Sequence, residues 1–189
     1  MRPPERTRPD ICCDILLFDY SAYPRDAFDF VFASCPCEAY SQLRVRAKIP
    51  RDEAMVHADR FVAKTREIIE HFSTALFCIE NPGYSLLWKR EVSAGLSPFA
   101  VLTDYCQFGR PFRKRTRLSS SFPITLPMCP GPGQCEQMVG NRHLVRSDLV
   151  RSEGGRTHTE IMHELPEGLC DSVLAQAERL LPGTPWAAY

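Results

Sequence analysis

The sequence predicts a single α/β domain with a mainly parallel sheet, and three observations carry that prediction. Short apolar runs that suit buried strands recur along the chain at 28–33, 75–79 and 99–106. The stretch between the first two has apolar residues at helical spacing. The length of 189 residues suits one domain. Strands that alternate with helical segments are typical of a parallel sheet covered by helices.

Each predicted element follows from a local pattern. Residues 28–33 read FDFVFA, an apolar run that meets Ser-Cys-Pro and predicts a buried strand ending in a loop. Apolar and charged residues interleave at helical spacing at 51–72, which predicts an amphipathic helix of about five or six turns. A closing helix is predicted where Pro166 suits the first turn and Pro182-Gly183 ends the pattern. In chain order, the predicted elements are a strand at 28–33, a helix at 51–72, a strand at 75–79, a short helix at 85–94, strands at 99–106 and 116–122, and a helix at 167–181.

The composition excludes some classes of protein. Lys and Arg number 23 and Asp and Glu also 23, so no overall positive field attracts nucleic acid and any such binding needs a local patch. The longest apolar run, 75–79, is far too short to cross a bilayer. The N-terminus MRPPERTRPD lacks the apolar core of a secretory signal. We therefore expect an intracellular protein, in the cytoplasm or nucleus of a host cell, that is neither secreted nor bound to a membrane.

The nine cysteines are an odd number, and their spacing is not that of a small disulfide scaffold. We expect reduced thiols, each of which serves as a core residue, a metal ligand or a nucleophile.

Two unusual tripeptides, Cys35-Pro36-Cys37 and Glu80-Asn81-Pro82, directly follow the first two predicted strands. Ligands of parallel sheets gather at the carboxyl ends of the strands. Cys37 is therefore a candidate nucleophile, with a small core residue or a metal-binding pair with Cys35 as the alternatives. Glu80 is a candidate proton donor at the same edge, because partial burial favours the protonated carboxyl. A helix-capping or turn residue is the alternative for Glu80.

A basic cluster and a possible metal site follow. Within eight positions lie Arg110, Arg113, Lys114, Arg115 and Arg117. Basic residues with aromatic neighbours suit phosphate contact and base stacking, although such a run can also be a solvated face. Farther along the chain, Cys129, Cys135 and His143 could supply three ligands of a structural zinc ion, with His158 or His163 as the fourth.

Taken in order, four stretches resemble the C5-cytosine-specific DNA methyltransferase family, in the compact form of phages and large viruses. They are Asp14-Ile15, DFVFASCPCEAYS at 29–41, FCIENP at 77–82 and DYCQFGRPFRKRTRL at 104–118. The Pro-Cys, Glu-Asn-Pro and Gly-x-Pro-basic elements are more specific in this order than any one alone. The resemblance implies a Rossmann-like class I methyltransferase sheet.

The resemblance also implies a reaction, in which a methyl group passes from S-adenosylmethionine to C5 of cytosine in DNA through a covalent cysteine adduct. Cys37 is then the attacking thiol, Glu80 the partner of cytosine N3, and Arg115 or a neighbour orients the base. Asp14, with Ile15, matches the family's acidic residue near the adenine, and Pro36 shapes the loop beside the cofactor. The residues assigned to DNA are Ser41, Arg110, Arg113, Lys114 and Arg117.

This resemblance divides the chain into three parts. Residues 1–125 form a partial catalytic core, 126–160 an irregular region for target recognition or zinc binding, and 161–189 a C-terminal helix that packs on the core.

The chain departs from the family where the cofactor's glycine-rich turn is expected. Only thirteen residues precede Asp14, and the first glycine is Gly83. We therefore expect an N-terminally truncated sheet, for which a different start, a second chain that completes the cofactor half, or loss of activity are the explanations. Two other functions stay open: a catalytically inactive DNA-binding remnant or subunit of a methyltransferase, and a thiol-dependent or zinc-stabilised protein unrelated to methylation.

Overall fold

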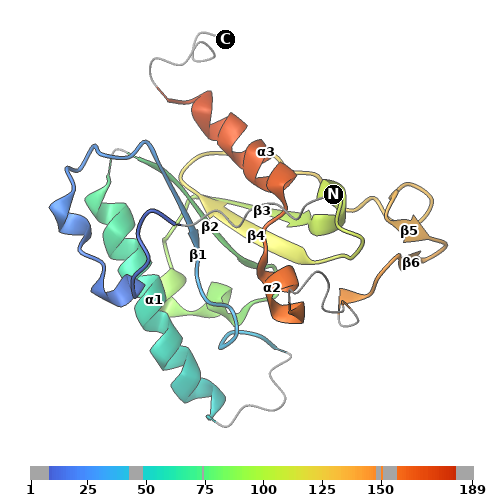
Figure 1. The fold of residues 1–189 in the computed structure, drawn as a ribbon, viewed down its shortest axis with the longest axis horizontal. Helices are drawn as coiled ribbons and strands as arrows, with labels where there is room; N and C mark the ends of the chain where they lie inside the picture. Colours follow the sequence, from blue (N-terminus) through green and yellow to red (C-terminus); the bar gives the residue numbers. More distant parts are fainter. Residues whose placement is uncertain (1–8, 43–48, 74, 148–149, 151–156, 182–189) are drawn as a thin grey trace.

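The computed structural model describes residues 9–42, 49–73, 75–147, 150 and 157–181 (Figure 1). Its centre is a four-stranded sheet in the order β1-β2-β4-β3. The strands are β1 (Phe30–Ser34), β2 (Leu76–Pro82), β3 (Phe99–Asp104) and β4 (Arg115–Ser120). The α/β class is therefore as predicted.

The prediction of a mainly parallel sheet holds only in part, because the described sheet is mixed and β1–β2 is its one parallel pair. β1 and β2 are parallel, whereas β4 is antiparallel to both of its neighbours, β2 and β3. The reason is the connection between β3 and β4, which consists of the one-turn helix η5 (Tyr105–Phe108) and a short loop. Such a link suits a hairpin, because a parallel crossover needs a dozen or more residues. Gly109 supports the reversal with a positive φ of 80° at the end of η5.

Helix α1 (Arg51–His71) confirms the predicted amphipathic helix. Two acidic residues in its first turn, Asp52 and Glu53, suit the positive end of the helix dipole. The predicted helix at 85–94 is instead two single-turn helices, η3 (Leu86–Lys89) and η4 (Glu91–Ser93), because Arg90 between them has an extended backbone.

The C-terminal part holds α3 (Glu167–Glu178), as predicted, and the shorter α2 (His158–His163), which the sequence analysis missed. A capping box of Thr157 and Glu160 begins α2. The segment expected to be irregular also contains a small hairpin of β5 (Met138–Val139) and β6 (Arg142–His143). At the N-terminal side lie two single-turn helices, η1 (Ile15–Leu17) and η2 (Tyr20–Ala22).

Two apolar clusters cover the two faces of the sheet. Cys78 belongs to the cluster that includes Leu169 and Val173 of α3, and Ile79 belongs to the cluster that includes Val62 of α1. Successive residues of a strand point to opposite faces, so α3 and α1 pack on opposite sides of β2 (Figure 1). None of the helices in the described part of the chain combines the length and apolar composition that a bilayer span requires.

Candidate active site

Cys37 lies in the loop that follows β1, and its side chain is half-buried. Its carbonyl oxygen accepts a hydrogen bond of 3.1 Å from the N–H of Tyr40, which turns the chain back toward the sheet. The residue lines a cavity of about 520 Å³, a size typical of ligand sites. Other lining residues include Ser41, Tyr84, Arg113, Lys114, Arg115 and His163.

Glu80 lies inside β2 rather than after it, because pairing with β4 extends that strand through Pro82. The side chain is 3% exposed, and its two oxygens have separate partners. Ser34 Oγ donates a hydrogen bond of 2.8 Å to Oε2, and Thr116 Oγ1 donates one to Oε1. These contacts from the two neighbouring strands hold the carboxyl group in one orientation.

Lys114 brings a positive charge to this edge of the sheet. Its Nζ donates hydrogen bonds to the carbonyl of Met162 at 2.8 Å and to the hydroxyl of Tyr105 at 3.2 Å. Burial lowers the pKa of Lys114, and the nearby Glu80 and Cys37 oppose that shift. The thiol, the carboxyl and the ammonium groups therefore interact electrostatically with one another.

The Cys37 thiol is protonated at neutral pH. Burial raises its pKa above the ordinary value, and the negative charges of Glu38 and Glu80 raise it further. Lys114 lowers the pKa but does not cancel these effects. The thiolate forms readily only if a bound ligand changes this balance or a base takes the proton.

The basic cluster is largely engaged in contacts within the chain. Asp104, which is fully buried, binds both Arg113 Nε at 3.2 Å and Arg115 Nη2 at 2.9 Å. Arg110 pairs with Glu164. The guanidinium carbon of Arg117 lies 4.6 Å from the ring centroid of Trp88.

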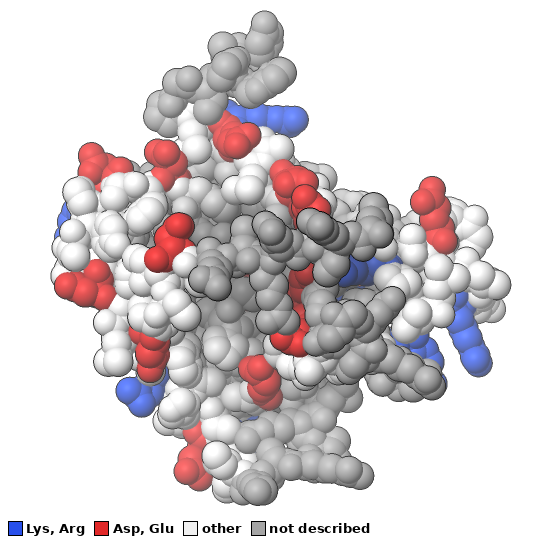
Figure 2. Space-filling view, viewed as in Figure 1, with Lys and Arg blue, Asp and Glu red and all other residues white. Residues whose placement is uncertain are grey.

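The predicted DNA-binding residues therefore fall into two groups. Ser41, Arg113 and Lys114 line the cavity with Cys37, whereas Arg110 and Arg117 do not. On the face shown in Figure 2, acidic side chains are scattered over the molecule, and basic side chains gather mainly toward the β5–β6 hairpin.

A second cavity, of about 510 Å³, lies beside β1, the edge strand of the described sheet. All three residues predicted to contact the cofactor, Asp14, Ile15 and Pro36, line it together with apolar side chains from β1 and α1. Asp14 also begins η1, since its Oδ1 accepts a hydrogen bond of 2.9 Å from Leu16 N–H. The lining of this cavity thus combines apolar walls with one carboxylate.

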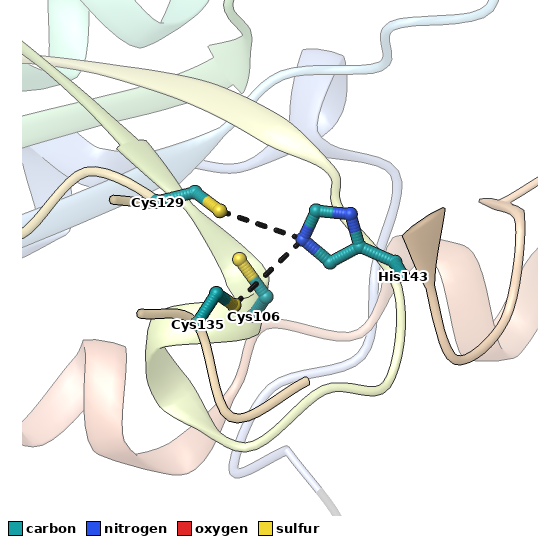
Figure 3. Close-up of side chains that lie close together, drawn as sticks. All are labelled: Cys106, Cys129, Cys135 and His143. Atoms are coloured by element: carbon teal, nitrogen blue, oxygen red, sulfur yellow. Dashed lines mark hydrogen bonds between the residues drawn. The ribbon is translucent and has the colours of Figure 1, made fainter. Parts of the chain in front are cut away.

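The three predicted metal ligands lie together, and Cys106 of η5 joins them. The ligand atoms of Cys106, Cys129, Cys135 and His143 all lie within 4.8 Å of one another, so the cluster could hold a metal ion (Figure 3). Neither histidine expected as the fourth ligand takes part. His158 Nε2 lies 3.1 Å from the Ser147 carbonyl oxygen, and His163 faces Glu38.

Several residues of the site escaped the sequence analysis. Ser34 and Thr116 hold Glu80, and Asp104 holds two arginines. The sequence gives a signal for two of these three residues: Ser34 directly precedes Cys35-Pro36, and Asp104 is the one acidic residue of the strand predicted at 99–106.

One comparison with known proteins bears on this site. No protein-family model matches the chain. A protein of Frog virus 3 (isolate Goorha) named "Probable DNA (cytosine-5)-methyltransferase" is 29% identical over 165 residues, which covers 78% of this chain and 73% of the viral protein. The chain is thus similar to a protein named for the methylation of cytosine in DNA, which supports the methyltransferase family.

Proposed function

We propose that this chain is a DNA (cytosine-5)-methyltransferase that transfers a methyl group from S-adenosylmethionine to cytosine through a covalent adduct with Cys37. The observation that carries the proposal is the association of Cys37, Glu80 and Lys114 at the carboxyl ends of the adjacent strands β1 and β2. The similarity to the viral protein, which is named for the same reaction, supports it.

The chemistry requires a nucleophile and an acid on either side of one base. Cytosine C5 is too electron-poor to attack a methyl donor, so the Cys37 thiolate first forms a bond to C6. The proton that the thiol gives up reaches N3 through the Glu80 carboxyl group, and the electron pair of the C5–C6 double bond then makes C5 nucleophilic. After methylation C5 loses its proton to solvent, the S–C6 bond breaks, and the N3 proton returns to Glu80.

Two basic residues of the chain, Lys114 and Arg115, suit the attack of the Cys37 thiolate on cytosine. Lys114 interacts electrostatically with both the thiol and the carboxyl group and lines the cavity with Cys37, so we propose that Lys114, rather than Arg115, stabilises the thiolate. Arg115 is held by Asp104 and by the Tyr84 hydroxyl, 3.2 Å from its Nη1, and lines the same cavity, where it would contact the base or its backbone. The base must leave its duplex to reach this cavity.

The cofactor supplies an activated methyl group on a sulfonium, which C5 can attack. We propose that Asp14, Ile15 and Pro36 hold its adenosine end in the cavity beside β1. Pro36 stands between that cavity and Cys37, so the loop after β1 would contact the cofactor on one side and the base on the other.

Release of the C5 hydrogen tests the base-activating half of the mechanism without the methyl donor. Reversible addition of Cys37 makes C5 exchange its proton with water, so DNA that carries tritium at cytosine C5 should release tritium when the protein is added. Cys37→Ala should abolish release. Cys170→Ala, a half-buried thiol in α3, is the matched control and should retain it.

A covalent trap tests the complete reaction. A duplex that contains 5-fluorocytosine should form a stable adduct with the chain in the presence of S-adenosylmethionine. The fluorine at C5 cannot be removed as the C5 proton is, so the bond between Cys37 and C6 does not break. Mass spectrometry should place the adduct on Cys37. DNA binding with neither exchange nor adduct would instead identify an inactive DNA-binding relative.

A further inference from the structure

Four metal-ligating side chains converge at a place that the proposed methyl transfer does not use. Cys106 comes from η5, Cys129 from the segment that follows β4, Cys135 from the turn before β5, and His143 from β6. In Figure 3 the sulfur atoms and the imidazole Nε2 point toward a common centre. Segments far apart in the chain thus bring four metal-ligating atoms together.

We propose that these four side chains bind one Zn²⁺ as a closed structural site. Three thiolates and one imidazole are a ligand set that zinc takes in a tetrahedral arrangement. With Zn–S near 2.3 Å and Zn–N near 2.0–2.1 Å, tetrahedral geometry puts the ligand atoms of this set about 3.5–3.8 Å apart. Nε2 of His143 lies 3.5 Å from Cys129 Sγ and 3.9 Å from Cys135 Sγ. Four protein ligands leave no open position, so the ion is structural rather than catalytic.

The surroundings of the cluster suit thiolates bound to a metal. Gln107 Nε2 lies 3.7 Å from Cys106 Sγ and 3.9 Å from Cys135 Sγ, so its amide donates toward two of the three sulfur atoms. Donors of this kind orient metal ligands and stabilise their negative charge.

The backbone around Cys135 is shaped to present the thiol. Gly131, with a φ of 91°, allows the chain to turn, and its carbonyl accepts a hydrogen bond of 3.0 Å from Cys135 N–H. The β5–β6 hairpin then returns the chain through Gly140, whose φ is 58°, and places His143 opposite Met138. A two-stranded hairpin this short is not stable alone, so an ion that joins it to η5 supplies the missing constraint.

The ion would also fix the position of Asp104, the carboxylate that binds two arginines of the basic cluster. The N–H of Cys129 donates a hydrogen bond of 3.1 Å to Asp104 Oδ2, and the same carboxylate binds Arg113 and Arg115. Cys106 lies two residues from Asp104 on the other side. Zinc therefore ties together two segments that flank this carboxylate, and its loss should loosen Arg115 at the cavity rim.

Metal analysis of the full chain tests the site directly. Protein purified under reducing conditions without chelator should contain one Zn²⁺ per chain by elemental analysis and by native mass spectrometry. Co²⁺ exchanged into the site should give the visible absorption and the sulfur charge-transfer band of tetrahedral cobalt thiolate. Zinc removal should lower the midpoint of thermal unfolding, and added Zn²⁺ should restore it.

Variants separate this site from adventitious binding. Cys106→Ala and His143→Ala should each lower zinc affinity by more than the roughly 10- to 100-fold that loss of an outer-shell partner costs, whereas Cys170→Ala, outside the cluster, should keep the full content. His143→Ala is the safer probe of the pair, because His143 is half-buried and Cys106 is buried. Wild-type protein that takes up no zinc under reducing conditions would overturn the proposal. So would an unchanged zinc content in both variants, or a disulfide between cysteines of the cluster that persists in the protein purified with reductant. None of these outcomes depends on methyl transfer.

Discussion

Ser34 and Glu80 lie opposite each other in the parallel pair β1–β2, and the Ser34 hydroxyl donates a hydrogen bond of 2.8 Å to Glu80 Oε2. This contact joins the strand that leads to Cys37 with the strand that carries the proposed acid. The register of β1 against β2 therefore sets the orientation of Glu80 relative to the loop that carries Cys37. Ser34 is a positioning residue, because its hydroxyl acts through Glu80.

Ser34→Ala should lower methyl transfer by between about 10- and 100-fold, because small displacements of a reacting group have effects of this size. The cost in unfolding free energy should be only about 0.5–1.5 kcal/mol, the usual value for one hydrogen bond. Single-turnover kinetics and urea unfolding give the two quantities. Ser34→Thr, which retains the hydroxyl, should restore most of the rate. A rate for Ser34→Ala equal to that of the wild type would show that Ser34 does not position Glu80.

The reactivity of Cys37 should rise with pH. Because burial holds the pKa of Cys37 above that of an unperturbed thiol, the thiolate fraction is small at neutral pH. While the pH is below the pKa, this fraction grows about tenfold for each unit by which the pH rises. Alkylation by iodoacetamide, followed at the Cys37 peptide by mass spectrometry, should therefore accelerate from pH 7 through 9. His163, which lies against Glu38, also lines the cavity of Cys37. An alkylation rate that reaches its plateau below pH 7 would contradict a raised pKa of Cys37.

Removing the charge of Lys114 should make Cys37 less reactive at each pH below its pKa. Lys114 is the group that lowers the thiol pKa, so Lys114→Gln should shift the alkylation profile to higher pH. Lys89→Gln changes an exposed lysine of η3 and is the matched control. An unshifted profile in Lys114→Gln would show that Lys114 does not stabilise the thiolate.

Asp104→Asn should destabilise the protein by about 2–4 kcal/mol, because the change removes the charge that two arginines share. Arg113 is 44% exposed and can be solvated, so the cost should fall below that of a fully buried pair. Urea unfolding measures the effect, with the exposed Asp171→Asn as the control. DNA binding should weaken as well, since Arg115 loses its anchor.

The fold was predictable where each element depends on local pattern. Helix α1 and strands β1 and β2 follow from periodicity and from apolar runs, and the structure places them at nearly the expected bounds. The antiparallel position of β4 between β2 and β3 depends on which strands pair in three dimensions. No local pattern encodes that choice, and the extension of β2 through Glu80 depends on the same pairing.

The candidate site divides in the same way. Cys37 and Glu80 could be predicted to lie at one edge of the sheet, because each follows an apolar run, at 28–33 and at 75–79. Cys106 could not be joined to Cys129 and Cys135, since its position in the cluster depends on how η5 packs against a loop more than twenty residues away. Contacts between side chains of distant segments follow from register and packing, which spacing in the sequence does not report.

Glu80→Gln separates the chemical role of the carboxyl group from its structural role. The amide has the same shape, and the hydroxyls of Ser34 and Thr116 can rotate to accept or donate, so the unfolding free energy should change by less than about 2 kcal/mol. Proton transfer to cytosine N3 is lost, and C5 tritium release should fall by about 10²–10⁴-fold, the usual contribution of a general acid. KM for DNA should change little, because Glu80 acts on the adduct rather than on binding. The exposed Glu91→Gln is the control. Retention of wild-type tritium release by a folded Glu80→Gln protein would remove Glu80 from the mechanism and leave it as a residue that joins β1, β2 and β4.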